Sequence, residues 1–431
     1  MRVDVGNALE EIARPGVPEE ALERLDRRVG RAHTRIEAGR TAGTHGYTAL
    51  NLPETTSSDR IESAINRVPD ATDVILVGIG GSALGAATVA MALDSDVRLH
   101  VLDHLDPVAL TRTLERVDLS STVVHIVSRS GTTTETVANA MIVKDAMNTA
   151  GLDWSDRTLV TTGQEGPLRD LVETHDLPAL TPPEGVPGRY SVLSTMGLPA
   201  LALCGHDIEA LLEGGRRAID TLDPSLFESP AYAYGAISYA LAVRGATVNA
   251  MMPYAEGLET FAEWFAQLWA ESLGKDGVGQ VPVRALGVTD QHSQLQLYRS
   301  GPSSVQVSFL RVTDRRTNVS VPSEPISDAA GVGGVTLSEI VDAEFKATEA
   351  SLAAAGRPTV RIDLPRIDER SLGSLLVNME AACMMAAELF GVNAFDQPAV
   401  EWGKRATRGV LADEETEETR AIAEKRRLEI P

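Results

Sequence analysis

The sequence predicts an α/β protein with two subdomains, each built on a parallel sheet that helices cover on both faces. Short apolar runs alternate with helical patterns in the first half of the chain, and the same alternation restarts near Pro230. This alternation is typical of parallel sheets, because crossover helices join their strands. The chain of 431 residues is also longer than one hydrophobic core usually serves. We therefore expect two domains, residues 1–225 and 226–431.

The first half starts with a charged amphipathic segment that predicts a helix extending to about Gly39, with Leu22, Leu25 and Val29 spaced to pack on one face. Four apolar runs follow, and each leads into a stretch rich in Gly, Ser, Thr or Asp, as strands do where they enter loops. The predicted strands are Val74–Val77, Val97–Leu102, Val123–Val127 and Leu159–Thr161. Prolines break the helical pattern between Thr221 and Pro230, where we place the domain boundary.

The second half repeats this order of elements. The predicted helices are residues 232–245, Leu258–Ser272, Gly334–Leu352 and Leu372–Leu389. The predicted strands are Thr247–Met251, Ser304–Val312 and Val360–Ile362. The charge run that closes the chain, residues 412–431, predicts a solvated helix or tail.

The composition excludes several classes of partner. The formal net charge is -22, from 61 acidic and 39 basic side chains, so the protein repels phosphate backbones and anionic lipid heads. We expect no nucleic acid and no membrane as partner. Lysine is scarce, so arginine carries most of the positive charge; the lysines are Lys144, Lys275, Lys346, Lys404 and Lys425. An acidic, lysine-poor composition resembles proteins of salt-accumulating halophiles, in which high salt screens the self-repulsion of the surface.

Cysteine usage and the N-terminus indicate the compartment. Cys204 and Cys383 both lie in apolar surroundings and are expected to be buried thiols, and two cysteines alone form neither a disulfide framework nor a zinc cluster. Acidic residues interrupt the N-terminal segment where a signal peptide needs an apolar run. The most apolar segments, such as Leu198–Cys204, are far shorter than a membrane span. These features predict a cytoplasmic protein.

A glycine-rich loop, VGIGGSALG at Val77–Gly85, follows the first predicted strand directly and opens a helix. Glycines let the backbone approach a ligand, and the first N–H groups of a helix attract an anion. The spacing of Gly78, Gly80 and Ala83 is also a degenerate dinucleotide fingerprint, with Asp103 near the position of a ribose-binding acid. A tight turn without a ligand explains this loop equally well, so both alternatives stay open here.

A second loop, SRSGTTTET at Ser128–Thr136, follows the third predicted strand. Five hydroxyl side chains and Arg129 precede a helix, and these groups together offer a phosphate monoester charge-assisted hydrogen bonds. A Ser/Thr helix cap would explain one or two of the hydroxyls but not all of them around an arginine. This loop predicts a phosphate site.

With three further segments, the two loops resemble the phosphoglucose isomerase family, whose members have the sugar isomerase fold. The segments are GRYSVLSTMGLPAL (188–201), AQLWAESLGKDG (266–277) with TDQHSQ (289–294), and FDQPAVEWGK (395–404). The blocks stand in the family's order from about residue 74 to 405. The resemblance implies two sugar-isomerase-type parallel-sheet α/β/α subdomains and reversible isomerisation between glucose 6-phosphate and fructose 6-phosphate by ring opening and a cis-enediolate, without metal or organic cofactor.

The resemblance also implies catalytic roles. Glu271, near the end of the helix predicted at Leu258–Ser272, matches the glutamate that moves the proton, and Gln267 one turn earlier matches a glutamine that contacts substrate. Arg189 matches the arginine that stabilises the enediolate oxyanion. His292 and Lys404 match the pair that opens the sugar ring. In the family this histidine comes from the neighbouring subunit, which implies an obligate homodimer with a shared active site.

The phosphate group is expected to bind both loops, through Gly81, Ser82, Ser128, Ser130 and Thr133 with Arg129 as the cation. The sequence departs from the family at two positions in these loops. Arg129 stands where many members have lysine, which keeps the charge and adds a bidentate option. Ala83 stands where many have aspartate, so any hydrogen bond of that aspartate is missing.

Other functions remain as alternatives. An NAD-dependent oxidoreductase would explain the glycine loop but leaves the hydroxyl loop without a role. A non-catalytic sugar-phosphate sensor would need the phosphate loops but not Glu271, Arg189, His292 and Lys404. A bifunctional phosphoglucose/phosphomannose isomerase is usually shorter and differs around Gln267 and Glu271. An amidotransferase-type isomerase domain would need a glutaminase domain that the N-terminal segment does not resemble.

Overall fold

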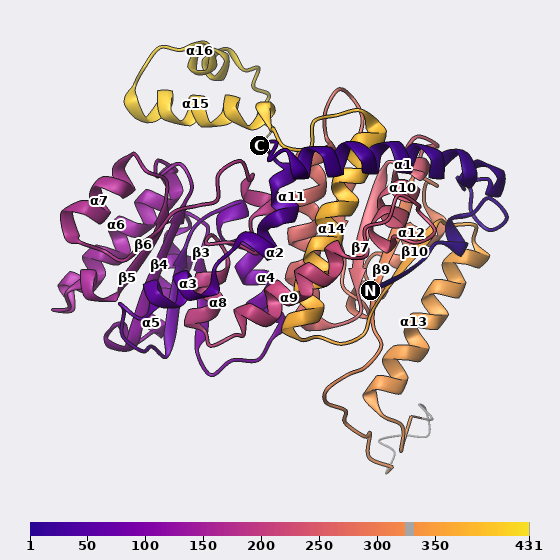
Figure 1. Cartoon of the computed structure of the whole chain (residues 1–431), viewed down its shortest axis with the longest axis horizontal. Coiled ribbons are helices and arrows are strands. Elements are labelled where there is room, and N and C mark those ends of the chain that lie inside the picture. The colour runs from indigo at the N-terminus through magenta and orange to yellow at the C-terminus, as the bar shows by residue number, and fades with distance from the viewer. Residues whose placement is uncertain (324–331, 431) are drawn as a thin grey trace. The chain divides into compact units, whose positions relative to one another are not determined.

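The computed structural model describes residues 1–323 and 332–430 of the chain. These residues divide into a large compact unit, Met1–Ala394, and a small one, Phe395–Pro431. The large unit contains two five-stranded sheets (Figure 1). Four of the five strands of one sheet run parallel to one another, and so do all five strands of the other, so the predicted α/β class is confirmed.

The first sheet has the strand order β3-β2-β4-β5-β6 and forms from the predicted apolar runs. Its strands are β2 (Asp73–Val77), β3 (Arg98–Leu102), β4 (Thr122–Ser128), β5 (Thr158–Thr162) and β6 (Ala179–Leu180). Every residue of β2, β4 and β5 is buried, which explains why these strands do not alternate between apolar and polar side chains. β2 contains the continuous apolar run VILV, whereas β4 (TVVHIVS) and β5 (TLVTT) also bury polar side chains. The sequence pattern missed β6, which has only two residues.

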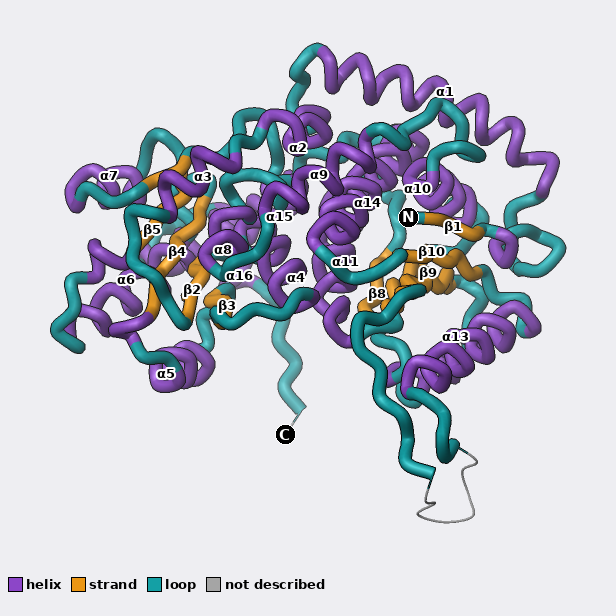
Figure 2. The backbone as a smooth tube through the Cα atoms, turned by 60° about the horizontal axis from the view of Figure 1, so that its bottom comes forward, coloured by secondary structure: helices purple, strands orange, loops and turns teal. Residues whose placement is uncertain are grey.

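Helices pack on both faces of this sheet (Figure 2). The apolar sides of β2, β4 and β5 form one core with α6 and α7, in which Met147, Trp154 and Leu168 are buried. The helices that follow or flank these strands are α3 (Ser58–Ile65), α4 (Leu84–Ala92), α5 (Pro107–Arg116), α6 (Thr134–Thr149), α7 (Pro167–His175) and α8 (Leu198–Leu203).

The second sheet has the order β1-β10-β9-β7-β8. Its strands are β1 (Arg2–Asp4), β7 (Val248–Pro253), β8 (Val281–Arg284), β9 (Val305–Val312) and β10 (Thr359–Leu364). The pattern predicted β7, β9 and β10 but missed β8, a short edge strand that contains Pro282. It also missed β1, which pairs antiparallel with β10. The predicted N-terminal helix therefore starts later, since α1 covers Glu19–Thr41.

The remaining helices of the large unit pack around the second sheet or between the sheets (Figure 1). They are α2 (Leu52–Thr55), α9 (Ile208–Ile219), α10 (Pro230–Ala242), α11 (Glu259–Leu273), α12 (Leu295–Ser300), α13 (Leu337–Ala354) and α14 (Glu369–Phe390). Within the described residues, α14 alone is long and apolar enough to cross a membrane, so the prediction that such segments are all far shorter is wrong. Its most apolar window is 89% buried, as in the central helix of a core.

The small unit consists of α15 (Pro398–Ala412), α16 (Glu417–Glu424) and the residues around them. An ion pair of 2.6 Å between Arg405 and Glu418 joins the two helices. Thr416 caps the N-terminus of α16 through its side chain, so part of the predicted solvated tail is helical.

Candidate active site

The two loops singled out in the sequence lie at the same edge of the first sheet. Their strands, β2 and β4, are parallel neighbours with Val77 opposite Ile126. The close packing extends one residue beyond β2, since a Cβ atom on Gly78 would lie 3.1 Å from the carbonyl oxygen of Val127 in β4. Because the loops leave the carboxyl ends of adjacent strands, at the point where the order of strands reverses, they form the crevice in which open α/β sheets bind ligands.

The hydroxyl groups of the second loop converge at the start of α6. Ser128 is buried, and its Oγ lies 3.0 Å from Oγ1 of Thr133; Ser130 Oγ lies 3.4 Å from the same atom. Thr133 is the N-cap residue of α6, yet its side chain makes no capping bond. The hydroxyls therefore face one another beside the unpaired N–H groups of a helix N-terminus, which suits a phosphate group.

Arg129 also belongs to this loop, and its guanidinium donates a hydrogen bond to the carbonyl oxygen of Val186. Burial lowers its pKa from the usual arginine value, but an arginine stays protonated in proteins. A fixed positive charge thus accompanies the hydroxyl groups.

The glycine loop packs against the segments that carry the predicted catalytic residues. A Cβ atom on Gly81 would lie 2.3 Å from the carbonyl carbon of Gly188 and 2.5 Å from the backbone nitrogen of Arg189. Gly80 has a φ of +57°, and a Cβ atom there would lie 2.9 Å from Nε2 of Gln267. The backbone contacts of Gly81 and the positive φ of Gly80 both favour glycine. The glycine loop thus approaches the end of β4 at Val127 on one side and Arg189 and Gln267 on the other.

Glu271 stands at the centre of a hydrogen-bonded cluster on α11. Its Oε2 accepts a bond of 3.1 Å from Nη1 of Arg189, and its Oε1 accepts one of 3.0 Å from Nε2 of Gln267. The Arg189 side chain is 2% exposed and that of Glu271 30%, so the cation is buried while the carboxylate is accessible. The Oε1 atom of Gln267 is buried without a hydrogen-bond partner in the described residues. Buried polar atoms usually have a partner, so this oxygen is available to accept a hydrogen bond from a ligand.

Sequence reasoning missed the groups that hold Arg189 in place. Its Nη2 donates to the backbone oxygen of Ala394 at 2.5 Å, and its Nε donates to Oγ of Ser272 at 2.9 Å. Ser272 follows Glu271 in the motif E-S-x-G-K (residues 271–275), which lies within the segment 266–277 that carries the family resemblance, and this adjacency was a signal for it. No sequence pattern pointed to a backbone carbonyl 205 positions away.

The arrangement of two phosphate-type loops beside a carboxylate, an amide and a buried guanidinium agrees with a match to a known family. The family model described as phosphoglucose isomerase matches residues 63–425. This chain belongs to the phosphoglucose isomerase family.

Proteins similar to this phosphoglucose isomerase family member are named as probable glucose-6-phosphate isomerases. A probable glucose-6-phosphate isomerase from Natronomonas pharaonis is 56% identical over 431 residues, which is 100% of both chains. A second, from Halobacterium salinarum, is 58% identical over 416 residues, covering 96% of this chain and 97% of the relative. Both organisms are halophilic archaea, in agreement with the halophilic character predicted from the composition.

Two solved structures share the fold of this family member. A hypothetical protein from Thermus thermophilus has a TM-score of 0.84 and 37% identity, covering 91% of this chain and 97% of that one. A glucose-6-phosphate isomerase from Chlamydia trachomatis has a TM-score of 0.83 and covers 94% of this chain and 89% of that one. At 21% identity, the second likeness supports the fold alone.

The two predicted ring-opening residues lie on different units of the chain, His292 in the large unit and Lys404 in the small one. His292 follows a short 3-10 helix, Thr289–Gln291, and its exposed side chain makes no hydrogen bond or ion pair within the described part of the chain. Lys404 belongs to the small unit, where it pairs with Glu401 at 2.7 Å and is 54% exposed. Their roles stay predictions.

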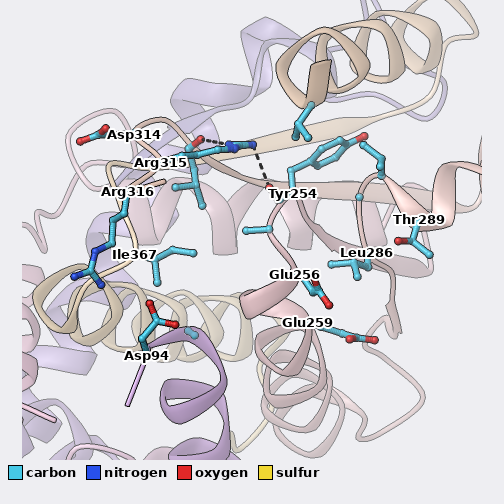
Figure 3. Close-up of a pocket in the computed structure, with 16 residues that line it drawn as sticks. Asp94, Tyr254, Glu256, Glu259, Leu286, Thr289, Asp314, Arg315, Arg316 and Ile367 are labelled. Carbon is cyan, nitrogen blue, oxygen red and sulfur yellow. Dashed lines mark hydrogen bonds between the residues drawn. The ribbon is translucent and has the colours of Figure 1, made fainter. Parts of the chain in front are cut away.

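A separate cavity of about 580 Å³ opens at the carboxyl ends of β7, β8 and β9 (Figure 3). None of the predicted site residues lines it. Its charged lining consists of four acids and two bases: Asp94, Glu256, Glu259, Asp314, Arg315 and Arg316. The excess of carboxylates makes this cavity less favourable for a phosphate dianion than the loops at the edge of the first sheet. The described residues contain no group of three or more His, Cys, Asp or Glu side chains arranged to hold a metal ion.

Proposed function

We propose that this protein is a glucose-6-phosphate isomerase that interconverts glucose 6-phosphate and fructose 6-phosphate through a cis-enediolate. The observation that carries the proposal is the contact of the Glu271 carboxylate with Arg189 and Gln267, directly beside the glycine loop. Family membership and the names of the relatives support the same reaction. No observation favours a sensor, an oxidoreductase or a bifunctional isomerase.

In this proposal Glu271 is the base that carries the proton. The carboxylate removes the proton from C2 of the open-chain aldose, the C2–H electron pair becomes a C1–C2 double bond, and the carbonyl electrons move to O1. Glu271 then returns the proton to C1 while the O2 hydroxyl gives up its proton and O1 gains one, which yields the ketose. The partial exposure of Glu271 leaves it accessible to a substrate.

Arg189 supplies the charge that the enediolate needs. Its guanidinium is buried, and three of its nitrogens are fixed by acceptors, so it requires no reorganisation when negative charge develops on O1 and O2. A buried cation also acts more strongly than one in water. The oxyanion forms only on the way to products, so this interaction favours turnover over ground-state binding.

The phosphate group binds the two loops in this proposal. The hydroxyls of Ser128, Ser130 and Thr133 and the first N–H groups of α6 receive it, with Arg129 as the countercharge. Gly81 and Ser82 bind the phosphate from the other loop, where Gly81 packs against the backbone of Gly188 and Arg189. A hexose phosphate has its phosphate at C6 and reacts at C1 and C2, so it suits a site with the phosphate loops at one end and Glu271 at the other.

Ring opening, assembly and compartment complete the proposal. His292 and Lys404 open the sugar ring, and His292 acts from the partner subunit of a homodimer. The enzyme works in the cytoplasm, in concentrated salt. Gel filtration with light scattering in concentrated KCl tests the dimer directly, because a monomer that is fully active excludes a shared site.

The reaction itself is tested by proton NMR of the purified protein with fructose 6-phosphate in heavy water and concentrated KCl. We expect glucose 6-phosphate to form with deuterium at C2, because a proton held on a carboxylate exchanges with solvent. Absence of glucose 6-phosphate contradicts the proposal. A nicotinamide absorbance change in a parallel sample with NAD would instead identify an oxidoreductase.

A further inference from the structure

Ser272 lies next to the predicted base in the sequence but contacts other groups in the structure. It is fully buried on α11, one residue after Glu271. Its Oγ accepts the 2.9 Å hydrogen bond from Nε of Arg189. Consecutive residues of one helix thus hold two edges of the same guanidinium, Glu271 at Nη1 and Ser272 at Nε.

The Ser272 hydroxyl also binds the residue that follows Arg189. The Tyr190 hydroxyl lies 2.9 Å from Ser272 Oγ, and both groups are fully buried. Burial raises the pKa of Tyr190 well above its ordinary value, so the phenol keeps its proton at any working pH. One serine therefore joins the turn Gly188–Tyr190 to α11 through two consecutive residues of that turn.

The backbone that carries Ser272 is itself held. Nζ of Lys275 donates hydrogen bonds of 2.7 Å and 2.8 Å to the carbonyl oxygens of Glu271 and Ser272, at the C-terminal end of α11. Cations in this position satisfy the last carbonyl groups of a helix. The hydroxyl therefore has a fixed position from which to orient the guanidinium.

We propose that Ser272 is a positioning residue for the isomerisation: its hydroxyl fixes the plane of the Arg189 guanidinium so that Nη1 stays beside Glu271, where the enediolate charge develops. This inference rests on the function proposed above. Ser272 acts through Arg189 and does not itself touch the substrate. Removal of its hydroxyl should therefore reduce transition-state stabilisation and leave substrate binding intact.

The first test is Ser272→Ala, assayed with fructose 6-phosphate in concentrated KCl. We expect kcat to fall on the order of 10-fold with KM changed less than about twofold, since the lost interaction serves the transition state. The affinity for a five-carbon sugar phosphate ending in a hydroxamate, a planar mimic of the enediolate, should fall by the same factor. The inhibition constant of inorganic phosphate, which probes only the loops, should not change. Ser272→Cys, with a weaker acceptor of similar shape, should give an intermediate kcat.

A matched control separates positioning from a general loss of a buried hydroxyl. Ser238 on α10 is equally buried, and its Oγ accepts a 2.9 Å hydrogen bond from Nε2 of Gln306 instead of from Arg189. We expect Ser238→Ala to lower the melting temperature but to leave kcat unchanged. If it lowers kcat as much as Ser272→Ala does, the effect is general and the proposal is overturned.

The decisive test is a double-mutant cycle with Arg189→Gln. If Ser272 works through Arg189, adding Ser272→Ala to Arg189→Gln should change kcat/KM less than about twofold. A full additive loss, or an unchanged kcat in Ser272→Ala alone, overturns the inference while the isomerase function stands. A wild-type protein that does not interconvert the two sugar phosphates overturns the function instead.

Discussion

The close approach of the glycine loop to the turn that carries Arg189 gives the sharpest prediction. Gly81→Ala adds a Cβ atom that would lie 2.3 Å from the carbonyl carbon of Gly188. Ordinary van der Waals contact begins at 3.4 Å, so the two backbones must separate by about 1.1 Å, the difference between these distances. Both neighbours are backbone, and no flexible side chain can turn away.

This separation would displace Arg189, because its backbone nitrogen lies 2.5 Å from the same added atom. A misplacement of about 1 Å in an active site costs about 10²-fold in rate. Overpacking of this kind also costs about 1–3 kcal/mol of stability. We expect Gly81→Ala to lower kcat/KM for fructose 6-phosphate about 100-fold and to lower the melting temperature.

Gly188→Ala is the matched control, since it adds the same methyl group on the opposite side of the same contact. There the nearest atom, Cα of Gly81, is 3.6 Å away, which is ordinary contact. Steady-state kinetics and thermal unfolding of both variants in concentrated KCl should show a large loss for Gly81→Ala only. Equal losses in the two variants, or full activity in Gly81→Ala, would refute the steric argument.

Three further predictions concern the base, the phosphate site and stability. Glu271→Gln should lower kcat by about 10²–10⁴-fold with KM little changed, as for loss of a general base, and near wild-type turnover would exclude that role. Ser130→Asp should raise KM at least 10-fold through charge repulsion, while Ser120→Asp on a distant exposed turn should not. Burial by itself raises the pKa of Asp73, but hydrogen bonds from Arg98, His100 and Thr72 outweigh it and lower the pKa from 3.8 to about 2. This depression corresponds to about 2 kcal/mol of stability, present above pH ~4 and lost as the pH falls toward ~2. Asp73→Asn should lose about that amount near neutral pH in denaturant unfolding, and the difference from wild type should shrink in acid.

The sequence by itself determined the fold class, the family and the two loops. Fully buried strands do not alternate and carry short apolar runs, so β2, β4 and β5 were visible from the local sequence pattern. The hydroxyl loop and the E-S-x-G-K motif each occupy one short stretch of chain, where turn chemistry and spacing can be interpreted locally. The excess of acidic residues and the scarcity of lysine, which indicated a halophilic protein, are properties of the composition and do not depend on the fold.

Only the tertiary structure decided which groups meet. β1 was hidden because three residues carry no periodicity, and they are ordered by pairing with residues some 360 positions later. The contact of Ser272 with Arg189 spans 83 positions, and that of Arg189 with the Ala394 carbonyl spans 205. Such contacts depend on how α11 and the backbone at Ala394 pack against the turn Gly188–Tyr190, and no local pattern encodes that packing. Sequence named Arg189 and Glu271 by family likeness, whereas the fold decided that a serine and a backbone carbonyl hold the arginine beside the carboxylate.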